Sequence, residues 1–137
     1  MDLGHWICDI PIELESFGFI YEIVNNVSGK IYIGKKQFEF RRKKKLRKNK
    51  KNRQIKVTES DWKTYTGSNK DLNADIAKLG KNYFTFRIIK FCNGKWDLTY
   101  SEIREQILRD VLLSDNYYNG IINCRLGRVK TKSKDIE

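Results

Sequence analysis

The sequence of 137 residues predicts an α/β fold of the α+β kind, in which helices flank a small, mainly antiparallel sheet of three strands. Runs of β-branched and aromatic residues at 17–24, 30–36 and 83–92 predict the strands. Apolar side chains at helical spacing beyond residues 68 and 100 predict the flanking helices. With 39% hydrophobic and 12% aromatic residues, the chain can fill one core, which excludes a disordered tail protein.

The first two strands are joined by the turn formers Asn-Asn-Val-Ser-Gly at residues 25–29, so they predict a β-hairpin. The next segment, residues 37–56, is basic and has only Phe38, Phe40 and Leu46 as apolar points. We expect it to be a helix that continues into a solvated loop.

Two helices are predicted further along the chain. Apolar residues at i, i+4 and i+7 predict one over residues 68–79, which Ser68 or Asn69 can cap and Gly80 can end. The second is expected at about residues 100–113, with an apolar face of Ile103, Ile107, Leu108, Val111 and Leu112. Beyond it, Ile121-Ile122 predicts a short final strand or a docked coil.

The chain is most simply one domain. Residues 17–123 form the predicted domain, with a basic insertion at 41–56. Residues 1–16 are expected to be an N-terminal extension, and residues 124–137 a mobile C-terminal tail.

The positive charge is concentrated in the basic insertion. The chain has 28 Lys and Arg against 17 Asp and Glu, and residues 41–56 hold eleven of the basic residues and no acid. Taking 11 from 28 leaves 17 basic and 17 acidic residues, so the rest of the protein is neutral. A nucleic-acid backbone would relieve the repulsion within the insertion, and Arg41, Lys43 and Lys44 are candidate contacts. The alternative is a solvated insertion without a partner.

The scarcity of histidine excludes several enzyme classes. His5 is the only histidine, so HExxH zinc proteases, Ser-His-Asp triads and histidine-metal nucleases are excluded, and His5 itself is expected at the surface. Cys8, Cys92 and Cys124 are too widely spaced for a metal knuckle. We expect them to be reduced and buried, as in a cytoplasmic protein, and no apolar run is long enough to span a membrane.

Two tyrosines mark a candidate site on the hairpin. Tyr21 and Tyr32 fall on adjacent antiparallel strands, where both hydroxyls can reach one small site. Lys35 and Lys36 follow directly and could bind a phosphate. The alternatives are cross-strand aromatic packing and an exposed lysine pair.

These residues carry a resemblance to a known family. Gly18-Phe19-Ile20-Tyr21 and Tyr32-Ile33-Gly34, followed by a helix, Gly80, a strand, a glutamate-bearing helix and Tyr118-Asn119, resemble the GIY-YIG nucleases. Within that family the chain is most similar to phage-encoded, homing-type endonucleases. The resemblance covers about residues 17–123 and departs from the signature at Phe19, where the family has glycine.

The resemblance implies a metal-dependent endonuclease that hydrolyses phosphodiester bonds of double-stranded DNA with Mg²⁺ or Mn²⁺. It implies that Tyr21 acts as the general base or relays to it, and that Tyr32 lines the same site. An arginine on the scissile phosphate is implied at Arg42, with Arg41 as the neighbouring alternative. The metal ligand is implied at Glu102, with Glu105 as the rival.

Two further site residues follow from the same resemblance. Asn119 is implied to support the site, and Tyr65 takes the position of a family histidine or tyrosine. If the protein is phage-encoded, it acts in the cytoplasm of the host cell. The sequence does not decide whether the protein binds DNA as a homodimer.

Each assignment has a structural alternative. Thr99-x-x-Glu102 is also a capping box, Asn119 can brace a turn, and Trp62 and Tyr65 can belong to a turn packed on the core. For the whole protein, the alternatives are a non-catalytic nucleic-acid-binding module that keeps the fold, and an RNA-binding protein of the ribosomal kind.

Overall fold

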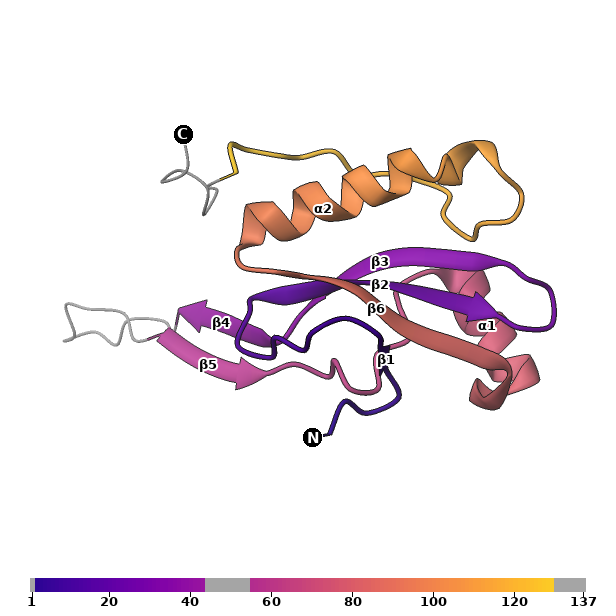
Figure 1. The fold of residues 1–137 in the computed structure, drawn as a ribbon, viewed down its shortest axis with the longest axis horizontal. Helices are drawn as coiled ribbons and strands as arrows, with labels where there is room; N and C mark the ends of the chain where they lie inside the picture. Colours follow the sequence, from indigo (N-terminus) through magenta and orange to yellow (C-terminus); the bar gives the residue numbers. More distant parts are fainter. Residues whose placement is uncertain (1, 44–54, 130–137) are drawn as a thin grey trace.

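A computed structural model describes residues 2–43 and 55–129 of the chain. Its main feature is a four-stranded sheet in the order β1-β6-β2-β3 (Figure 1). The strands are β1 (Ile7–Cys8), β2 (Gly18–Asn25), β3 (Ile31–Gln37) and β6 (Phe84–Cys92). β2 pairs antiparallel with both β3 and β6, and β1 runs parallel to β6. The three predicted antiparallel strands are therefore confirmed, and β1 is an addition.

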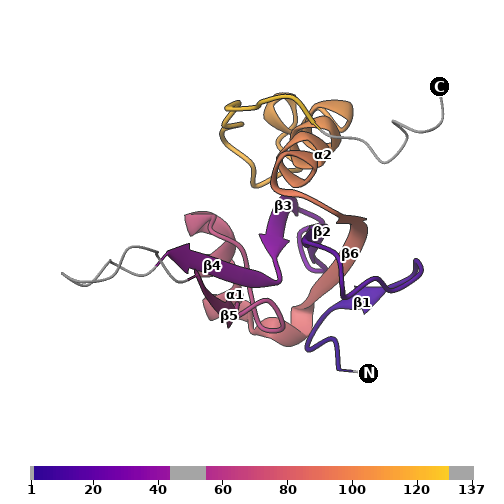
Figure 2. The same ribbon diagram turned by 90° about the vertical axis from the view of Figure 1, so that its left-hand side faces the viewer.

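The two faces of this sheet are covered by different elements. Helix α2 (Lys95–Leu108) lies on one face, while helix α1 (Lys70–Leu79) and the N-terminal segment lie on the other (Figures 1 and 2). Ile20, Ile33 and Leu98 pack in the core beneath α2. The opposite core is aromatic and contains Trp6, Phe19, Tyr21, Phe38, Trp62, Phe84, Phe86 and Phe91. The N-terminal segment thus contributes Trp6 to the core and β1 to the sheet.

Residues 37–56 do not form the predicted helix. β4 (Glu39–Lys43) and β5 (Ile55–Glu59) instead pair antiparallel as a separate two-stranded sheet, and residues 44–54 lie outside the described part of the chain. Like charges three and four residues apart destabilise a helix, and the β-branched residues of β5 favour a strand. The predicted turn packing of Trp62 is confirmed, because Trp62 is buried against Phe38 with ring centroids 4.9 Å apart.

The predicted first helix is confirmed and the second needs correction. α1 is capped by Asn69, whose side chain accepts a hydrogen bond from Leu72 N, and it ends at Gly80 with φ of 94°. α2 begins at Lys95, not near residue 100, and ends at Leu108. Ile107 and Leu108 are exposed, so the predicted apolar face was wrong there. Two polar residues of α2, Thr99 and Gln106, are buried instead because they hydrogen-bond to β3.

After α2, a short 3₁₀ turn, η2 (Val111–Leu113), leads into a coil that runs along the outer edge of β3. Ile31 N donates to Asn116 O and Tyr118 N donates to Ile31 O, at 2.9 and 2.8 Å. Residues 121–129 form no regular structure, so the alternative of a final strand was wrong. Residues 130–137 of the expected mobile tail lie outside the described residues.

Two sequence expectations about single residues also need correction. Cys92 is buried and Cys8 half-buried, but Cys124 is exposed. His5 is half-buried, not a surface residue, and stacks on Phe86 at a centroid distance of 3.9 Å. Burial, helped by the nearby Lys81, lowers the pKa of His5 to about 4. Among the described residues, no helix is long and apolar enough to cross a membrane.

Candidate active site

A pocket of about 370 Å³ lies at the outer edge of β3, between residues from the α1 side and residues from the α2 side of the sheet. Six of the residues predicted from the sequence line it together: Tyr21, Tyr32, Lys35, Tyr65, Glu102 and Asn119. The other lining residues are Ser68, Asn69, Gln106, Gly120, Ile121 and Asn123. They come from the loop before α1, from α2 and from the coil that follows η2.

The two signature tyrosines lie on the same face of the hairpin, as the strand pattern predicted. Their ring centroids are 6.1 Å apart. Tyr21 is opposite Gly34 in the β2–β3 register, and a β-bulge in the pairing with β6 falls between Ile20 and Tyr21. Bulges next to active sites redirect side chains. Tyr21 is only 1% exposed, and its hydroxyl makes no hydrogen bond to any residue that the structure describes.

Gly34 is required by the position of Tyr21. A Cβ at residue 34 would lie 2.6 Å from Tyr21 Cζ and 2.9 Å from Tyr32 Cε2, closer than real Cβ contacts. On the far side of the Tyr21 hydroxyl is Gly67, where a Cβ would be 3.3 Å from the oxygen. Gly67 also has φ of 81°, which favours glycine. The last residue of the Tyr-Ile-Gly signature therefore makes room for the first tyrosine.

Lys35 and Lys36 point to opposite faces of β3, because side chains alternate along a strand. Lys35 lines the pocket, while Lys36 is not among its lining residues. The Lys36 ammonium pairs with Asp61 at 2.7 Å and lies 3.9 Å from the centre of the Tyr65 ring. Lys36 therefore holds the loop that carries Tyr65, and a contact from Lys36 to substrate stays a prediction.

Glu102 projects into the pocket from the middle of α2. Its side chain is 18% exposed, and its nearest cation among the described side chains is Lys35, with Nζ 4.0 Å from Oε1. Lys35 Nζ meanwhile donates to Thr99 Oγ1 at 2.9 Å, and Thr99 Oγ1 donates to Lys95 O at 3.1 Å. Because α2 begins at Lys95 with Gly94 as its N-cap, Thr99 lies within the helix and does not cap it. The capping-box alternative was therefore wrong.

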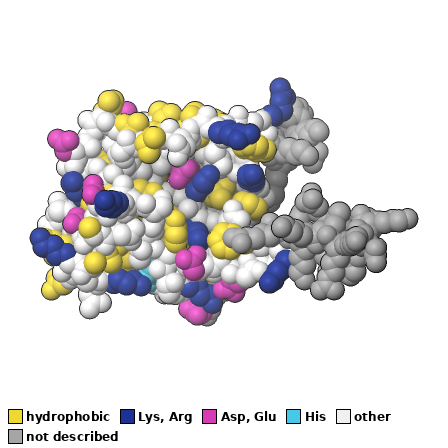
Figure 3. All heavy atoms as spheres, turned by 180° about the vertical axis from the view of Figure 1, so that it is seen from behind, with side chains coloured by type: hydrophobic (Ala, Val, Ile, Leu, Met, Phe, Trp, Pro, Cys, Tyr) yellow, Lys and Arg dark blue, Asp and Glu magenta, His cyan; other side chains and the backbone are white. Residues whose placement is uncertain are grey.

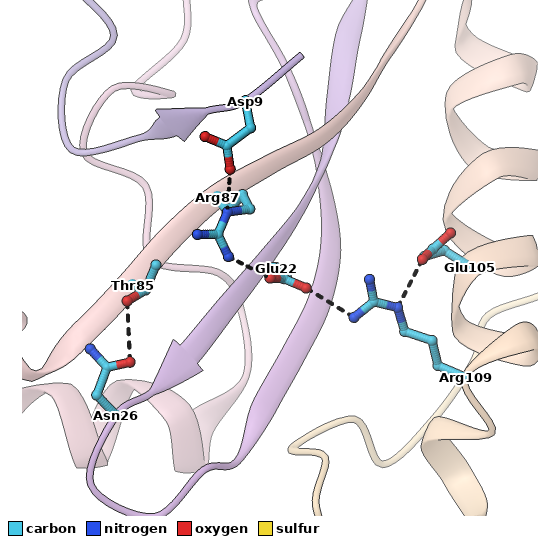
Figure 4. A network of polar contacts seen from close by, with 7 residues as sticks. All are labelled: Asp9, Glu22, Asn26, Thr85, Arg87, Glu105 and Arg109. Atoms are coloured by element: carbon cyan, nitrogen blue, oxygen red, sulfur yellow. Dashed lines mark hydrogen bonds and ion pairs between the residues drawn. The ribbon is translucent and has the colours of Figure 1, made fainter.

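Glu105, the rival of Glu102, is engaged elsewhere. Its carboxylate accepts from Arg109 Nε at 2.8 Å, and Arg109 Nη1 donates to Glu22 on β2 at 2.9 Å (Figure 4). Glu22 also pairs with Arg87, which pairs with Asp9. This chain of charges ties α2 to the sheet. It leaves Glu102 as the α2 carboxylate that lines the pocket.

The side-chain amides of Asn119 and Gln106 hydrogen-bond to the backbone of Ile33 at the outer edge of β3. Asn119 accepts from Ile33 N at 3.0 Å and donates to Ile33 O at 2.8 Å. Gln106 Nε2 donates to the same carbonyl at 3.0 Å. The Asn119 amide thus braces the signature strand, and Asn119 also belongs to the pocket wall.

Burial raises the pKa of all four ionisable acids of the pocket. Desolvation is the main cause for Tyr21, Tyr32, Tyr65 and Glu102 alike, and the charge of Glu102 further raises the pKa of each tyrosine. For Glu102 itself, Lys35 opposes the effect of burial. The three hydroxyls are therefore protonated at neutral pH, and ionisation of Glu102 is more costly than in water.

This donor set fits a hard divalent cation. Glu102 is a largely buried carboxylate with one long cation contact, and it accepts no hydrogen bond from the described residues. Within residues 2–43 and 55–129, no group of three or more His, Cys, Asp or Glu could hold a metal ion. Mg²⁺ often binds through one or two carboxylates, retained waters and substrate phosphates, so one carboxylate suffices.

The basic insertion contributes little to the described structure. The backbones of Arg41, Arg42 and Lys43 belong to β4, but their side chains, and Lys44 as a whole, lie outside what the structure describes. On the face of the molecule that Figure 3 shows, basic and acidic side chains are interspersed. This agrees with the neutral charge of the chain outside residues 41–56.

Sequence reasoning missed most of the polar wall of the pocket. Ser68, whose hydroxyl lies 3.5 Å from Tyr32 Oη, and Asn69 carry only the signal of a helix start in the sequence. Gln106 follows Glu102 by one helical turn, so that spacing could have indicated it. Gly120, Ile121 and Asn123 reach the pocket only because the coil returns along β3.

Comparison with known proteins agrees with this geometry. Residues 6–122 match the model of a family described as "Putative endonuclease segE, GIY-YIG domain". A search of curated proteins and a search of solved structures each gave no match. The family match covers most of the chain and includes both tyrosine signatures, α2 and the coil along β3. The chain therefore belongs to the GIY-YIG nuclease family, among the SegE-type endonuclease domains.

Proposed function

We propose that this protein is an endonuclease that hydrolyses phosphodiester bonds of double-stranded DNA with Mg²⁺ or Mn²⁺ held at Glu102. The observation that carries the proposal is the meeting of Tyr21, Tyr32 and Glu102 in one pocket with Lys35 beside them. We further propose a homing or related role of the phage type, in the cytoplasm of a host cell.

Tyr21 is proposed to receive the proton of the attacking water, directly or through a relay. Its hydroxyl faces the pocket without a hydrogen-bond partner among the described residues, so it is free to bond a water. Because burial raises its pKa, the hydroxyl is protonated in the free protein, so it would first have to lose its own proton to solvent. The tyrosinate that then accepts the proton of water would need a nearby positive charge to stabilise it. General base help of this kind contributes typically ~10²–10⁴-fold.

The remaining pocket residues are proposed to orient the phosphate and to stabilise its charge. Tyr32, with Ser68 at 3.5 Å, offers a hydroxyl donor, and Lys35 offers an ammonium beside Glu102. A divalent cation bound at Glu102 would supply the largest positive charge for the pentavalent phosphate. Arg42, with Arg41 as the alternative, remains the proposed contact to the scissile phosphate.

The basic insertion is proposed to hold the DNA backbone outside the pocket. The eleven Lys and Arg of residues 41–56 begin at Arg41, four residues beyond the end of β3 at Gln37. Contacts to phosphates give affinity without sequence readout. In this proposal the pocket carries out catalysis and the insertion binds the DNA backbone. A homodimer on DNA is one arrangement that would place two pockets on the two strands.

Cleavage of supercoiled plasmid by the purified protein tests the proposal. We expect nicking or linearisation in Mg²⁺, abolished by EDTA, and a loss of about 10²-fold or more in Glu102→Ala. Glu105→Ala is the matched control, because it removes a carboxylate from the same helix outside the pocket. Equal cleavage by Glu102→Ala would refute Glu102 as the metal ligand. Binding of DNA without cleavage under all metal conditions would favour the non-catalytic binding module.

A further inference from the structure

Gln106 is a buried polar residue on α2 with one defined partner. Its side chain is 5% exposed, and its amide donates to Ile33 O at 3.0 Å, across 73 residues of sequence. The Ile33 carbonyl is thereby saturated, because Asn119 Nδ2 also donates to it. A buried amide is retained in a core only when its hydrogen bonds are made, so this contact fixes the Gln106 rotamer.

The position of Gln106 connects the two halves of the pocket. Glu102 precedes it by one helical turn, so both side chains lie on the same side of α2, and both line the pocket. On β3, Ile33 lies between Tyr32 and Gly34, and Gly34 faces the Tyr21 ring. The bond therefore joins the helical turn that carries the carboxylate to the strand that positions both tyrosines.

A second link to β3 is present at Thr99, about one turn of α2 before Glu102. Lys35 Nζ donates to Thr99 Oγ1 at 2.9 Å, but the Lys35 side chain is 38% exposed and carries a flexible stem. The Gln106 side chain is shorter than that of Lys35, and its hydrogen bond to Ile33 O is buried. The Gln106 contact is thus the more rigid constraint on the Glu102 turn relative to β3.

We propose that Gln106 is a positioning residue that sets Glu102 against the tyrosines of β2 and β3 and so sets the affinity of the pocket for its divalent cation. This inference rests on the proposed function. Gln106 bonds to Ile33 O and would act on Glu102 only through the helical turn that they share. Groups bonded directly to metal ligands typically change metal affinity by 10–100-fold when removed, so we expect an effect at the lower end of that range. Loss of the bond leaves α2 anchored by the Arg109–Glu22 ion pair and by Leu98 and Ile103 in the core, so the fold survives.

Gln106→Met tests the inference, because it keeps the length of the side chain and removes its donor. We expect the Mg²⁺ concentration for half-maximal plasmid cleavage to rise about tenfold. A second readout needs no catalysis: paramagnetic broadening by Mn²⁺ of amide NMR signals around the pocket, in DNA-free protein, should need about tenfold more Mn²⁺. Glu105→Gln is the control, since it breaks an ion pair on the neighbouring residue outside the pocket.

A raised metal requirement in Gln106→Met, with an unchanged requirement in Glu105→Gln at a comparable melting temperature, supports the inference. An unchanged requirement in Gln106→Met, or an equal rise in the control, overturns it. If Gln106→Met does not fold, Gln106→Asn keeps the amide but cannot span the distance, and it should give the same metal shift. A wild-type protein whose cleavage ignores EDTA would refute the proposed function instead, while the Mn²⁺ measurement would still decide the role of Gln106.

Discussion

Replacement of Gly34 by alanine should inactivate the enzyme while leaving the fold and the DNA affinity in place. The new Cβ would lie 2.6 Å from Tyr21 Cζ, whereas ordinary contact begins at 3.4 Å, so atoms must separate by at least the difference of 0.8 Å. Tyr21 is buried against Trp6 and Tyr65, with ring centroids 5.0 and 6.2 Å away, so its ring cannot move freely. Overpacking of this kind destabilises by about 1–3 kcal/mol.

The expected effect on catalysis is larger than the effect on stability. A misplacement of about 1 Å in a reacting group can reduce the rate by ~10²-fold. We therefore expect the plasmid cleavage rate at saturating Mg²⁺ to fall about 10²-fold. The melting temperature should fall by roughly 3 °C for each kcal/mol. Binding of a non-cleavable duplex should be unchanged, because the basic insertion is untouched.

Gly120→Ala is the matched control, because Gly120 also lines the pocket but a Cβ there would meet nothing within 4 Å. Combining Gly34→Ala with Tyr21→Phe removes the phenolic oxygen next to the new methyl group but keeps the ring carbon Cζ, so the double variant should regain part of the lost stability without regaining activity. If Gly34→Ala cleaves as fast as Gly120→Ala, then Tyr21 either moves without penalty or takes no part in the chemistry.

Three further perturbations separate the roles of the pocket and of the insertion. Tyr21→Phe should retain fold and DNA binding while turnover falls ~10²-fold or more; a loss of fold with full activity would favour simple aromatic packing. Glu102→Gln should raise the melting temperature in EDTA above pH 7. The folded pKa of Glu102 is raised by burial, so its stabilising neutral form is lost as pH rises through that pKa. The two proteins should converge at acid pH, and a lower melting temperature for the variant at high pH would contradict this account. Neutralising lysines 43, 44, 45, 48, 50 and 51 should make the slope of log affinity against log salt shallower by roughly 0.9 for each DNA phosphate that the variant no longer neutralises. An unchanged slope would mean that the insertion is merely solvated.

Local sequence patterns were sufficient for the three antiparallel strands of the main sheet and for the first helix. Strand residues alternate between faces, so the sequence showed that Tyr21 and Tyr32 can share one side of a hairpin, and the register of Tyr21 opposite Gly34 places them there. The Asn69 cap and the terminal Gly80 of α1 depend on backbone groups within a few residues. Such features are local, and the sequence alone therefore determined them.

Other features depended on partners that are distant in sequence. The buried side of α2 was mispredicted because it is set by two hydrogen bonds with β3 as well as by apolar residues: Thr99 accepts one from Lys35, and Gln106 donates one to Ile33. The residues after Gln37 form β4 because β5 pairs with them, and a basic composition does not encode that pairing.

Which of Glu102 and Glu105 lines the pocket also depended on tertiary contacts. Both lie on α2, three residues apart, and the sequence does not state which of them meets Arg109 and Glu22. The sequence by itself determined the family, the fold class and the pair of tyrosines, because these follow from residue order and strand alternation. Only the tertiary structure decided which carboxylate and which amides line the pocket, because a helix can rotate against a sheet until its buried polar groups find their partners.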